Sequence, residues 1–311
     1  REKKTTLKDM RKKIDALKNR LYNVRLKRPA PALEKQVLAS WSAMMARGYI
    51  DLYTVTGKEK DLVIAKKTMS FIEKEMTADG ELRHSRMNDT LSDETYLEDY
   101  SLAIAAYIDL FEATQDMAYL KKAESHVNKT IELFGDDKNG GFYMSASHLA
   151  TPIVRQKAYF DNATPSGAAM MAMNLLRLYA LTGDKNHFDQ AVLTLRSGSE
   201  YTRMSNMMVA TYLRALSAEV NGVREFALVG KGDDPAVKQA LGEILRAPVF
   251  TRVALLIDHD KPESVPAVHK DKSQLGDEPT LYLCRNFACD TPVAGLKAIR
   301  KVIDKESKRI E

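Results

Sequence analysis

The side chains that could do chemistry in this chain of 311 residues gather in the stretches between its helical segments and at the starts of the helices that follow. Glu98 and Asp161 form a carboxylate pair that could act as general acid and general base, and their separation would decide the stereochemistry of a hydrolysis. Aromatic faces combined with a few polar groups are typical of small-molecule sites. The residues that could bind a carbohydrate or similar polyol in this way are Trp41, Arg83, His84, Asp99, Tyr100, Arg155, Tyr159 and Asn162.

The same polar residues also have a structural interpretation as helix caps. Asp, Asn, Ser and Thr side chains accept hydrogen bonds from the free N–H groups at a helix start. The spacing predicts Thr164 as such a cap, with Pro165 in the first helical position. Asp161 and Asn162 would then tie the loop to that helix or to Arg155, without a catalytic role. Both interpretations stay open.

A short phrase recurs three times along the chain and indicates the elements that must position these residues. Its copies are Asp-Leu-Tyr-Thr-Val-Thr-Gly at 51–57, Asp-Leu-Phe-Glu-Ala-Thr-Gln at 109–115 and Arg-Leu-Tyr-Ala-Leu-Thr-Gly at 177–183. The starts of the copies lie 58 and 68 residues apart. Self-similarity at such spacings predicts a stack of helical hairpins, each of which buries its apolar side against the next.

The predicted helices are joined by connections that alternate in length. We expect helices at 3–27, 37–56, 58–77, 93–114, 116–134, 165–182, 185–200 and 204–220. Tight turns alternate with long connections at 28–36, 78–92 and 135–164. In antiparallel hairpins all long connections share one end, which is where a site is expected.

The composition of the helices divides them into two classes. The stretches 101–108 and 167–173 are apolar on nearly every side, which is typical of helices buried all round. The segments 58–77, 116–134 and 185–200 carry charged residues on one face. The first class is therefore predicted to form an inner ring and the second an outer ring.

The pattern changes after residue 222. Apolar runs of strand character alternate there with two amphipathic segments, which predicts a small, mostly parallel α/β subdomain. The fold class is thus mainly α, with a helical-hairpin domain at 1–222 and the subdomain at 223–311.

The net charge of +5 is concentrated at the start of the chain. Residues 1–28 hold twelve Lys or Arg against three acidic residues, but they also hold an apolar stripe at helical spacing. We expect a packed helix with a solvated basic face and no nucleic-acid partner, because Tyr22 is the only aromatic residue there that could stack on a base. No apolar run approaches the ~20 residues of a membrane span and no signal peptide opens the chain, so we predict no membrane partner. Two cysteines give no disulfide framework, so we expect a cytoplasmic location.

Cys284 and Cys289 are the two cysteines, in a Cys-x4-Cys arrangement. This spacing is neither a thioredoxin motif nor half of a zinc site, so no metal and no cofactor are predicted. Two interpretations stay open. The thiols pack as small apolar groups, or they form a redox-sensitive pair in which Cys289, expected near a helix start, has a stabilised thiolate.

Several phrases together resemble one known family. They lie at 37–45 around Trp41, at 98–100, at 140–143, at 161–167 and at 281–289. They are similar to the carboxyl-terminal half of the thioredoxin-domain-containing proteins that include a spermatogenesis-associated member. The resemblance implies an (α/α)6 toroid of the six-hairpin glycosidase type, a shape shared with sugar epimerases and glycoside hydrolases. We expect the family's thioredoxin-like domain to be absent from this chain.

The chain departs from the family pattern at polar positions near the expected mouth of the toroid. Glu-Lys-Gln at 34–36 stands where the family usually has Asp-Asp-Lys, Ser42 and Ala43 replace Asn and Gly, and Ala168 replaces Asn. We therefore expect a scaffold or interaction half with a degenerate site, and the alternative is a carbohydrate-binding or carbohydrate-active protein resembling epimerases or glycoside hydrolases. Whether the chain is an enzyme stays open.

The number of predicted helices implies an incomplete ring. Twelve helices close an (α/α)6 toroid and eight are predicted, so two inner helices should expose apolar flanks. We expect the chain to be part of a longer protein, because it opens at Arg1 within a helical pattern. The expected partners are a sugar-like small molecule and, at the flanks, the missing amino-terminal segment or a second copy of the chain.

Overall fold

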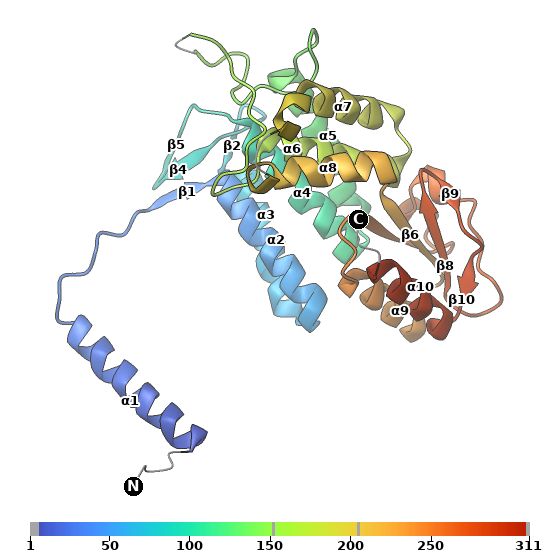
Figure 1. Cartoon of the computed structure of the whole chain (residues 1–311), viewed down its shortest axis with the longest axis horizontal. Helices are drawn as coiled ribbons and strands as arrows, with labels where there is room; N and C mark the ends of the chain where they lie inside the picture. The colour runs from blue at the N-terminus through green and yellow to red at the C-terminus, as the bar shows by residue number, and fades with distance from the viewer. Residues whose placement is uncertain (1–5, 151–152, 204–205, 309–311) are drawn as a thin grey trace. The chain divides into compact units, whose positions relative to one another are not determined.

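The structure is a computed structural model that describes residues 6–150, 153–203 and 206–308 (Figure 1). The chain divides into two compact units, Arg1–Gln36 and Val37–Glu311. The first unit contains the helix α1 (Leu7–Arg25), whose N-cap Thr6 accepts a hydrogen bond from Asp9 N. The apolar side chains predicted to pack are all exposed: Leu7, Met10, Ile14, Leu17, Leu21 and Val24. The predicted helix is confirmed, and its predicted packing stays a prediction.

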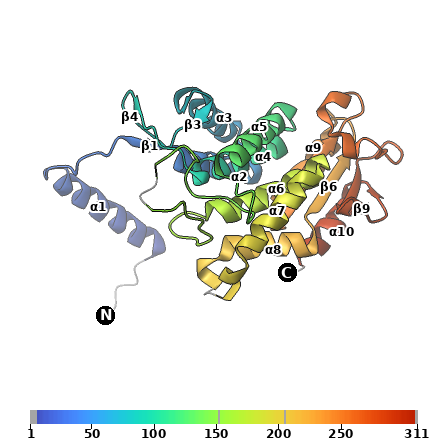
Figure 2. The same cartoon turned by 90° about the horizontal axis from the view of Figure 1, so that it is seen from above.

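The second unit is built from helical hairpins, as the repeated phrase predicts. Helices α2 (Ala39–Thr56), α4 (Leu97–Thr114), α6 (Gly167–Thr182) and α8 (Ala210–Asn221) pack side by side in chain order. Helices α3 (Glu59–Glu75), α5 (Met117–Phe134) and α7 (Lys185–Ser197) each pack behind the helix that precedes them (Figure 2). The predicted fold class, mainly α with a partial toroid of helical hairpins, is confirmed.

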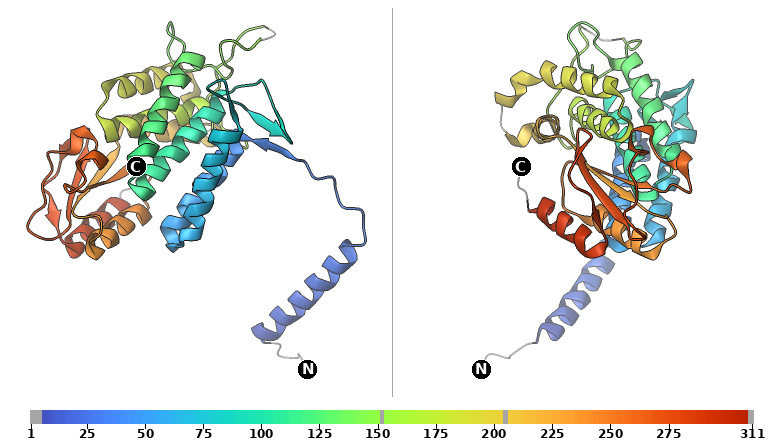
Figure 3. Two further views of the ribbon diagram at one scale, coloured as in Figure 1. Left: turned by 180° about the vertical axis from the view of Figure 1, so that it is seen from behind. Right: turned by 90° about the vertical axis from the view of Figure 1, so that its right-hand side faces the viewer.

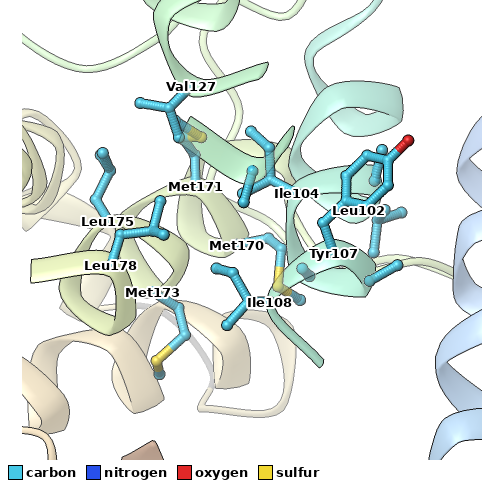
Figure 4. Close-up of a cluster of buried hydrophobic side chains, with 14 of the residues drawn as sticks. Leu102, Ile104, Tyr107, Ile108, Val127, Met170, Met171, Met173, Leu175 and Leu178 are labelled. Atoms are coloured by element: carbon cyan, nitrogen blue, oxygen red, sulfur yellow. The ribbon is translucent and has the colours of Figure 1, made fainter. Parts of the chain in front are cut away.

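The inner helices α4 and α6 form the centre of the hydrophobic core. Both are buried on nearly every side, and their Leu, Ile and Met side chains meet in one cluster (Figure 4). The outer helices α3, α5 and α7 bury a single stripe each. The predicted division into inner and outer helices follows from this difference in composition.

The three short turns end their helices with a residue in the left-handed region. Gly57 and Gly183 have φ of 69° and 75°, which glycine adopts without strain. Gln115 has φ of 60° in the second turn. Its side chain accepts a hydrogen bond from Leu256 N at 2.6 Å, so the residue that replaces glycine joins the hairpin to the sheet.

The long connections carry short strands and lie together at the opposite end of the hairpins. Residues 36–91 contribute β1 (Gln36–Leu38), β2 (Thr77–Ala78), β3 (Glu81–Leu82), β4 (Ser85–Met87) and β5 (Thr90–Leu91), with β1, β4 and β5 in one sheet. Leu97 N donates to Met144 O and Ala146 N to Thr95 O, so the second and third connections touch. The prediction that the connections at 78–92 and 135–164 share one end is confirmed.

The carboxyl-terminal part forms a sheet between two helical layers (Figure 3). Its elements are β6 (Arg224–Val229), α9 (Pro235–Arg246), β7 (Arg252–Ile257), β8 (Thr280–Arg285), β9 (Ala288–Cys289), β10 (Val293–Ala294) and α10 (Leu296–Ser307). The order is β10-β8-β6-β7, with β9 beside β8. Of these strand pairs only β6–β7 is parallel, so the prediction of a mostly parallel sheet is wrong. One sheet face joins the main helical core, and the division at residue 222 stays a prediction.

Four short 3-10 helices complete the described elements: η1 (Ser199–Arg203), η2 (Asn206–Met208), η3 (Pro262–Ser264) and η4 (Ala267–His269). Within the described ranges, no helix combines the length and the apolar character that a membrane crossing needs.

Candidate functional site

The candidate site lies where the inner helices α2, α4 and α6 begin. Leu97 N is bonded to Met144 O, which fixes the start of α4 and places Glu98 and Asp99 in its first turn. Acidic residues are favoured there, because the free N–H groups of a helix start carry partial positive charge. The sequence therefore places two adjacent carboxylates at the end where the long connections meet.

Asp99 is fully buried and caps the start of the neighbouring helix α2. Its Oδ1 accepts a hydrogen bond from Ser40 N at 2.9 Å, while no side chain of residue 38 caps α2. Its Oδ2 lies 2.9 Å from His84 Nδ1. His84 O accepts a bond from Ala39 N, so His84 and Asp99 together satisfy the first two N–H groups of α2.

The imidazole of His84 is held in one orientation by its neighbours. Besides the bond to Asp99, its ring meets the Tyr96 ring edge-on, with centroids 4.9 Å apart. The hydrogen bond to Asp99 raises the pKa of His84 above 6.5, and the opposing effect of burial is smaller. The bond therefore favours the protonated ring relative to a free imidazole.

Glu98 is half-buried beside this pair. Burial, and then the charge of Asp99, raise the pKa of Glu98 above its ordinary value of 4.5. Ligand atoms of His84, Glu98 and Asp99 all lie within 4.8 Å of one another. A metal ion there would compete with the hydrogen bonds that both Asp99 oxygens already accept. The arrangement is thus better suited to proton transfer than to metal binding.

A pocket of about 340 Å³ opens beside these groups. Its polar and aromatic lining comes from the second and third connections and the start of α4: His84, Tyr96, Glu98, Phe160, Asn162, Thr164 and Ser166. Gly167 lets α6 come close to α4, because a Cβ there would lie 3.1 Å from Glu98 N.

Asp161, the predicted partner of Glu98, has a different environment. Its two oxygens accept bonds from Ser166 N at 2.8 Å and from Thr211 N at 2.7 Å, which ties the starts of α6 and α8. The N-cap of α6 is Ser166, whose side chain accepts from Ala169 N, so the prediction of Thr164 as the cap is wrong. Asp161 is not among the residues that line the pocket.

Two of the aromatic residues predicted to bind a ligand belong to the core. Tyr100 and Tyr159 are each 1% exposed. The hydroxyl of Tyr100 accepts a bond from Leu82 N, and that of Tyr159 donates to Thr194 O. Their rings cannot stack on a solvent-borne ligand, so this prediction is wrong for both. Trp41 is 57% exposed on α2 but does not line the pocket.

The two arginines predicted for the site are also engaged in its supporting loops. Arg83 pairs with Glu81 and Asp79 at 3.5 Å. Arg155 donates to Ser145 O and Leu133 O, and its guanidinium lies over the Tyr143 ring. The predicted link between Arg155 and Asp161 is absent from the contacts of the described residues, because Arg155 is already bound to the third connection.

The structure adds Tyr96 and Phe160 to the site, which the sequence did not single out. Both are half-buried and give the pocket its aromatic faces. Tyr96 stands just before α4, so its ring is free of the close packing that buries Tyr100 one turn later. Position relative to the helix start was the signal that could have distinguished these two tyrosines.

Cys284 and Cys289 form a disulfide in the structure. They are directly opposite each other in the β8–β9 hairpin, with Cys284 buried and Cys289 exposed. The interpretation as two packed thiols is therefore wrong. Cys289 lies in β9 rather than near a helix start, so the reason given for a stabilised thiolate is wrong too.

Comparisons with known proteins agree with the resemblance predicted from the sequence. The chain is 29% identical over 300 residues to human spermatogenesis-associated protein 20, and 26% identical over 309 residues to an uncharacterized protein of Caenorhabditis elegans. These matches cover 91% and 96% of this chain but 38% and 42% of the relatives. The chain therefore spans about two fifths of the length of the curated relatives it matches. No family model matches the chain.

Among solved structures, a GH76 α-mannanase of Bacteroides thetaiotaomicron has a similar fold. The TM-score is 0.50 at 15% identity, and the match covers 89% of this chain and 71% of the mannanase. At this identity the likeness concerns the fold alone. It confirms the helical-hairpin architecture of glycosidase type.

Proposed function

We propose that this chain, a relative of spermatogenesis-associated protein 20 with the helical-hairpin fold of a glycosidase, binds a carbohydrate at the starts of α4 and α6 and transfers protons there. One observation carries the proposal. A half-buried glutamate with a raised pKa, Glu98, lies beside the hydrogen-bonded pair His84–Asp99 at a pocket with two aromatic faces. Titratable groups whose surroundings bring their pKa values toward neutrality are typical of acid–base catalysis.

Each group of the pocket has a separate role in this proposal. Glu98 donates a proton to a sugar oxygen, because its raised pKa keeps more of the carboxyl protonated. His84 accepts a proton on the ring nitrogen that faces away from Asp99, while Asp99 fixes the ring. Tyr96 and Phe160 provide apolar faces for the ring of the sugar, and Asn162 provides an amide for its hydroxyl groups.

The sequence alone favoured a scaffold, because polar groups of the family are lost at Gln36 and Ala168. Gln36 is exposed in β1, and Ala168 is a buried residue of the pocket wall. Neither position belongs to the cluster of His84, Glu98 and Asp99. We therefore place carbohydrate binding first, and keep the predicted cytoplasmic location as part of the same proposal.

A titration with sugars tests the proposal. The chain is mixed with mannose- and glucose-containing mono- and disaccharides, which are chosen first because the solved neighbour is an α-mannanase. At least one sugar should raise the melting temperature, and Phe160→Ala should remove that rise. Glu124→Gln is a control variant that should keep the rise in melting temperature. Like Glu98, Glu124 is half-buried with a pKa raised by burial, but it does not line the pocket. A melting temperature that no sugar changes would reject carbohydrate binding.

A second candidate function, an interaction half, is favoured by the surface of α2. Trp41, Met45, Leu52 and Val55 are exposed at spacings of four, seven and three residues, which places them along one side of the helix. Exposed apolar stripes mark contact surfaces. We propose that the occupant is a part of the longer protein outside this chain, because the matched relatives are more than twice as long.

Binding of a hydrophobic dye tests whether the apolar stripe on α2 is a contact surface that is covered in the complete protein. The chain alone should bind a hydrophobic dye, and Trp41→Ser with Met45→Ser should reduce the signal. The complete protein should not bind the dye at this stripe. A dimer of the isolated chain that the same two substitutions dissociate would instead identify a second copy as the occupant and contradict our assignment.

A further inference from the structure

A buried carboxyl group lies next to the disulfide and takes no part in the proposed carbohydrate site. Glu225 in β6 is 1% exposed, and its Oε2 has no hydrogen-bond partner among the described residues. Its Oε1 accepts a bond from Phe287 N at 3.1 Å, in the turn that joins the two cysteines. A carboxyl group this deeply buried is unfavourable unless it has a partner or holds a proton.

The strand register brings Glu225 and Cys284 together. They are directly opposite each other in the antiparallel β6–β8 pair, so their side chains leave the same face of the sheet with Cβ atoms about 5 Å apart. Their neighbours Phe226 and Leu283 are also paired and belong to the core on the opposite face. The Cys284 sulfur and the Glu225 carboxyl therefore share one buried environment.

The other ionisable groups near this environment do not neutralise Glu225. Lys272, whose side chain is 7% exposed, has Asp271 as its ion-pair partner at 3.5 Å. His269 is fully buried, and burial with the charge of Lys272 lowers its pKa to about 4, so it is neutral. Burial raises the pKa of Glu225 to about 7 in spite of Lys272. Glu225 can thus hold or release a proton at neutral pH.

The two cysteines differ in their access to solvent. Cys289 is exposed in the edge strand β9, whereas Cys284 is 1% exposed. An attacking thiolate therefore reaches the Cys289 sulfur, and the Cys284 sulfur becomes the leaving group. A thiolate that forms in a buried, apolar place is unfavourable unless it obtains a proton.

We propose that Cys284–Cys289 is a redox-active disulfide that exchanges with a dithiol, and that Glu225 supplies the proton to the buried Cys284. The reductant's thiolate attacks the Cys289 sulfur, the disulfide bond breaks, and its electron pair stays on Cys284. Cys284 takes the proton of Glu225, which becomes a carboxylate. The second thiol of the reductant then displaces Cys289, so the reductant leaves as a disulfide and the protein holds two thiols. Solvent returns the proton to Glu225.

The rate of reduction by dithiothreitol between pH 5 and pH 9 tests this inference. The Glu225→Gln variant keeps an oxygen for Phe287 N but carries no acidic proton. The parent should be reduced about tenfold faster or more than this variant at pH 6, as is typical of a lost general acid. The ratio should approach one above pH 8, where Glu225 is ionised. Since the reagent titrates equally in both reactions, the ratio isolates Glu225.

Glu243→Gln is the control, because Glu243 lies in the same subdomain on α9 and pairs with Arg300 away from the disulfide. Dithiothreitol should reduce this variant at the same rate as the parent at every pH. A ratio of one throughout, or a native disulfide that dithiothreitol does not reduce, would overturn the proposal. If Glu225→Gln does not fold, infrared spectroscopy of the parent during reduction tests the proton transfer through the band of the protonated Glu225 carboxyl. The band should fall while Cys284 takes the proton and recover when solvent returns it, and a band that stays constant throughout the reaction would reject proton transfer.

Discussion

The two ends of the inner helices stabilise buried and half-buried carboxylates in different ways. At the amino-terminal ends, Asp99 and Asp161 accept backbone N–H groups from the first turns of neighbouring helices. Toward the carboxyl-terminal end of α4, Asp109 and Glu112 pair with arginine side chains. The first arrangement uses the backbone and the second uses side-chain cations.

The direction of the helices explains this difference. Free N–H groups give a helix start partial positive charge, and free carbonyl groups give its end partial negative charge. Glu112, in the last turn of α4, is therefore disfavoured by its own helix and needs the two guanidinium groups of Arg177 and Arg252, each at 2.7 Å. At the starts the helix itself favours negative charge, and among the described residues no arginine or lysine forms an ion pair with Glu98, which lies beside His84 and Asp99.

The same contrast appears in the pKa values. Burial alone would raise the pKa of Asp109, but the charges of Arg47 and Arg177 outweigh it and lower the pKa to about 2. Glu98 forms no ion pair with an arginine or lysine among the described residues, and burial raises its pKa although the charge of His84 opposes this. We therefore interpret the carboxyl-terminal end as structural and the amino-terminal end as the place of chemistry.

The largest expected effect comes from Glu112→Ala. This change leaves Arg252 without its carboxylate partner among the described residues and removes one of two partners of Arg177. Breaking a buried ion pair from one side commonly costs about 3–5 kcal/mol, so we expect a loss of that size in the free energy of unfolding. Urea denaturation measures it. A loss below about 1 kcal/mol, the range of exposed pairs, would remove the distinction between the two ends.

A smaller loss is expected for Asp161→Ala, which removes the acceptor of two helix-start N–H groups. Charge-assisted hydrogen bonds of this kind predict a cost of about 1–3 kcal/mol. The control is Asp184→Ala, because Asp184 caps α7 through one bond, to Asn186 N, and should cost less. An unchanged or raised melting temperature for Asp161→Ala would contradict the structural role and return Asp161 to the list of acid–base candidates.

The fold was largely predictable because its signals are local. The repeated phrase marked the three hairpin turns, and the alternation of loop lengths placed the long connections at one end. The direction of β8 was not predictable, because an apolar run does not state whether its strand runs parallel or antiparallel to β6. The role of Gln115 was hidden for a similar reason, since its partner Leu256 lies 141 residues away.

The candidate site was predictable in part. The residue types at 84, 98, 99 and 162 by themselves indicate polar chemistry, and three of these side chains line one pocket. The cap that Asp99 gives to α2 spans 59 residues and has no local signal. Tyr100 was assigned wrongly because α4 is buried on nearly every side, so composition does not tell which of its aromatic residues faces the pocket. Tyr159 was assigned wrongly because its ring packs against Tyr201 and Tyr212, which are 42 and 53 residues away in the chain and give no local signal.

The smallest expected effect, and one of opposite sign, belongs to Glu98→Gln. A carboxyl whose pKa is higher in the folded protein than its ordinary value of 4.5 binds its proton more tightly when folded, so its ionisation opposes folding. At pH 7 the variant should therefore be more stable than the parent, by about 0.5–1 kcal/mol. Below pH 4.5 the carboxyl is protonated in both states, and the advantage should vanish. Melting temperatures at pH 4 and pH 7 check this. A variant that is less stable at pH 7 would show that Glu98 stabilises the helix start as Asp99 does, and the two ends of α4 would then differ in their partners but not in their function.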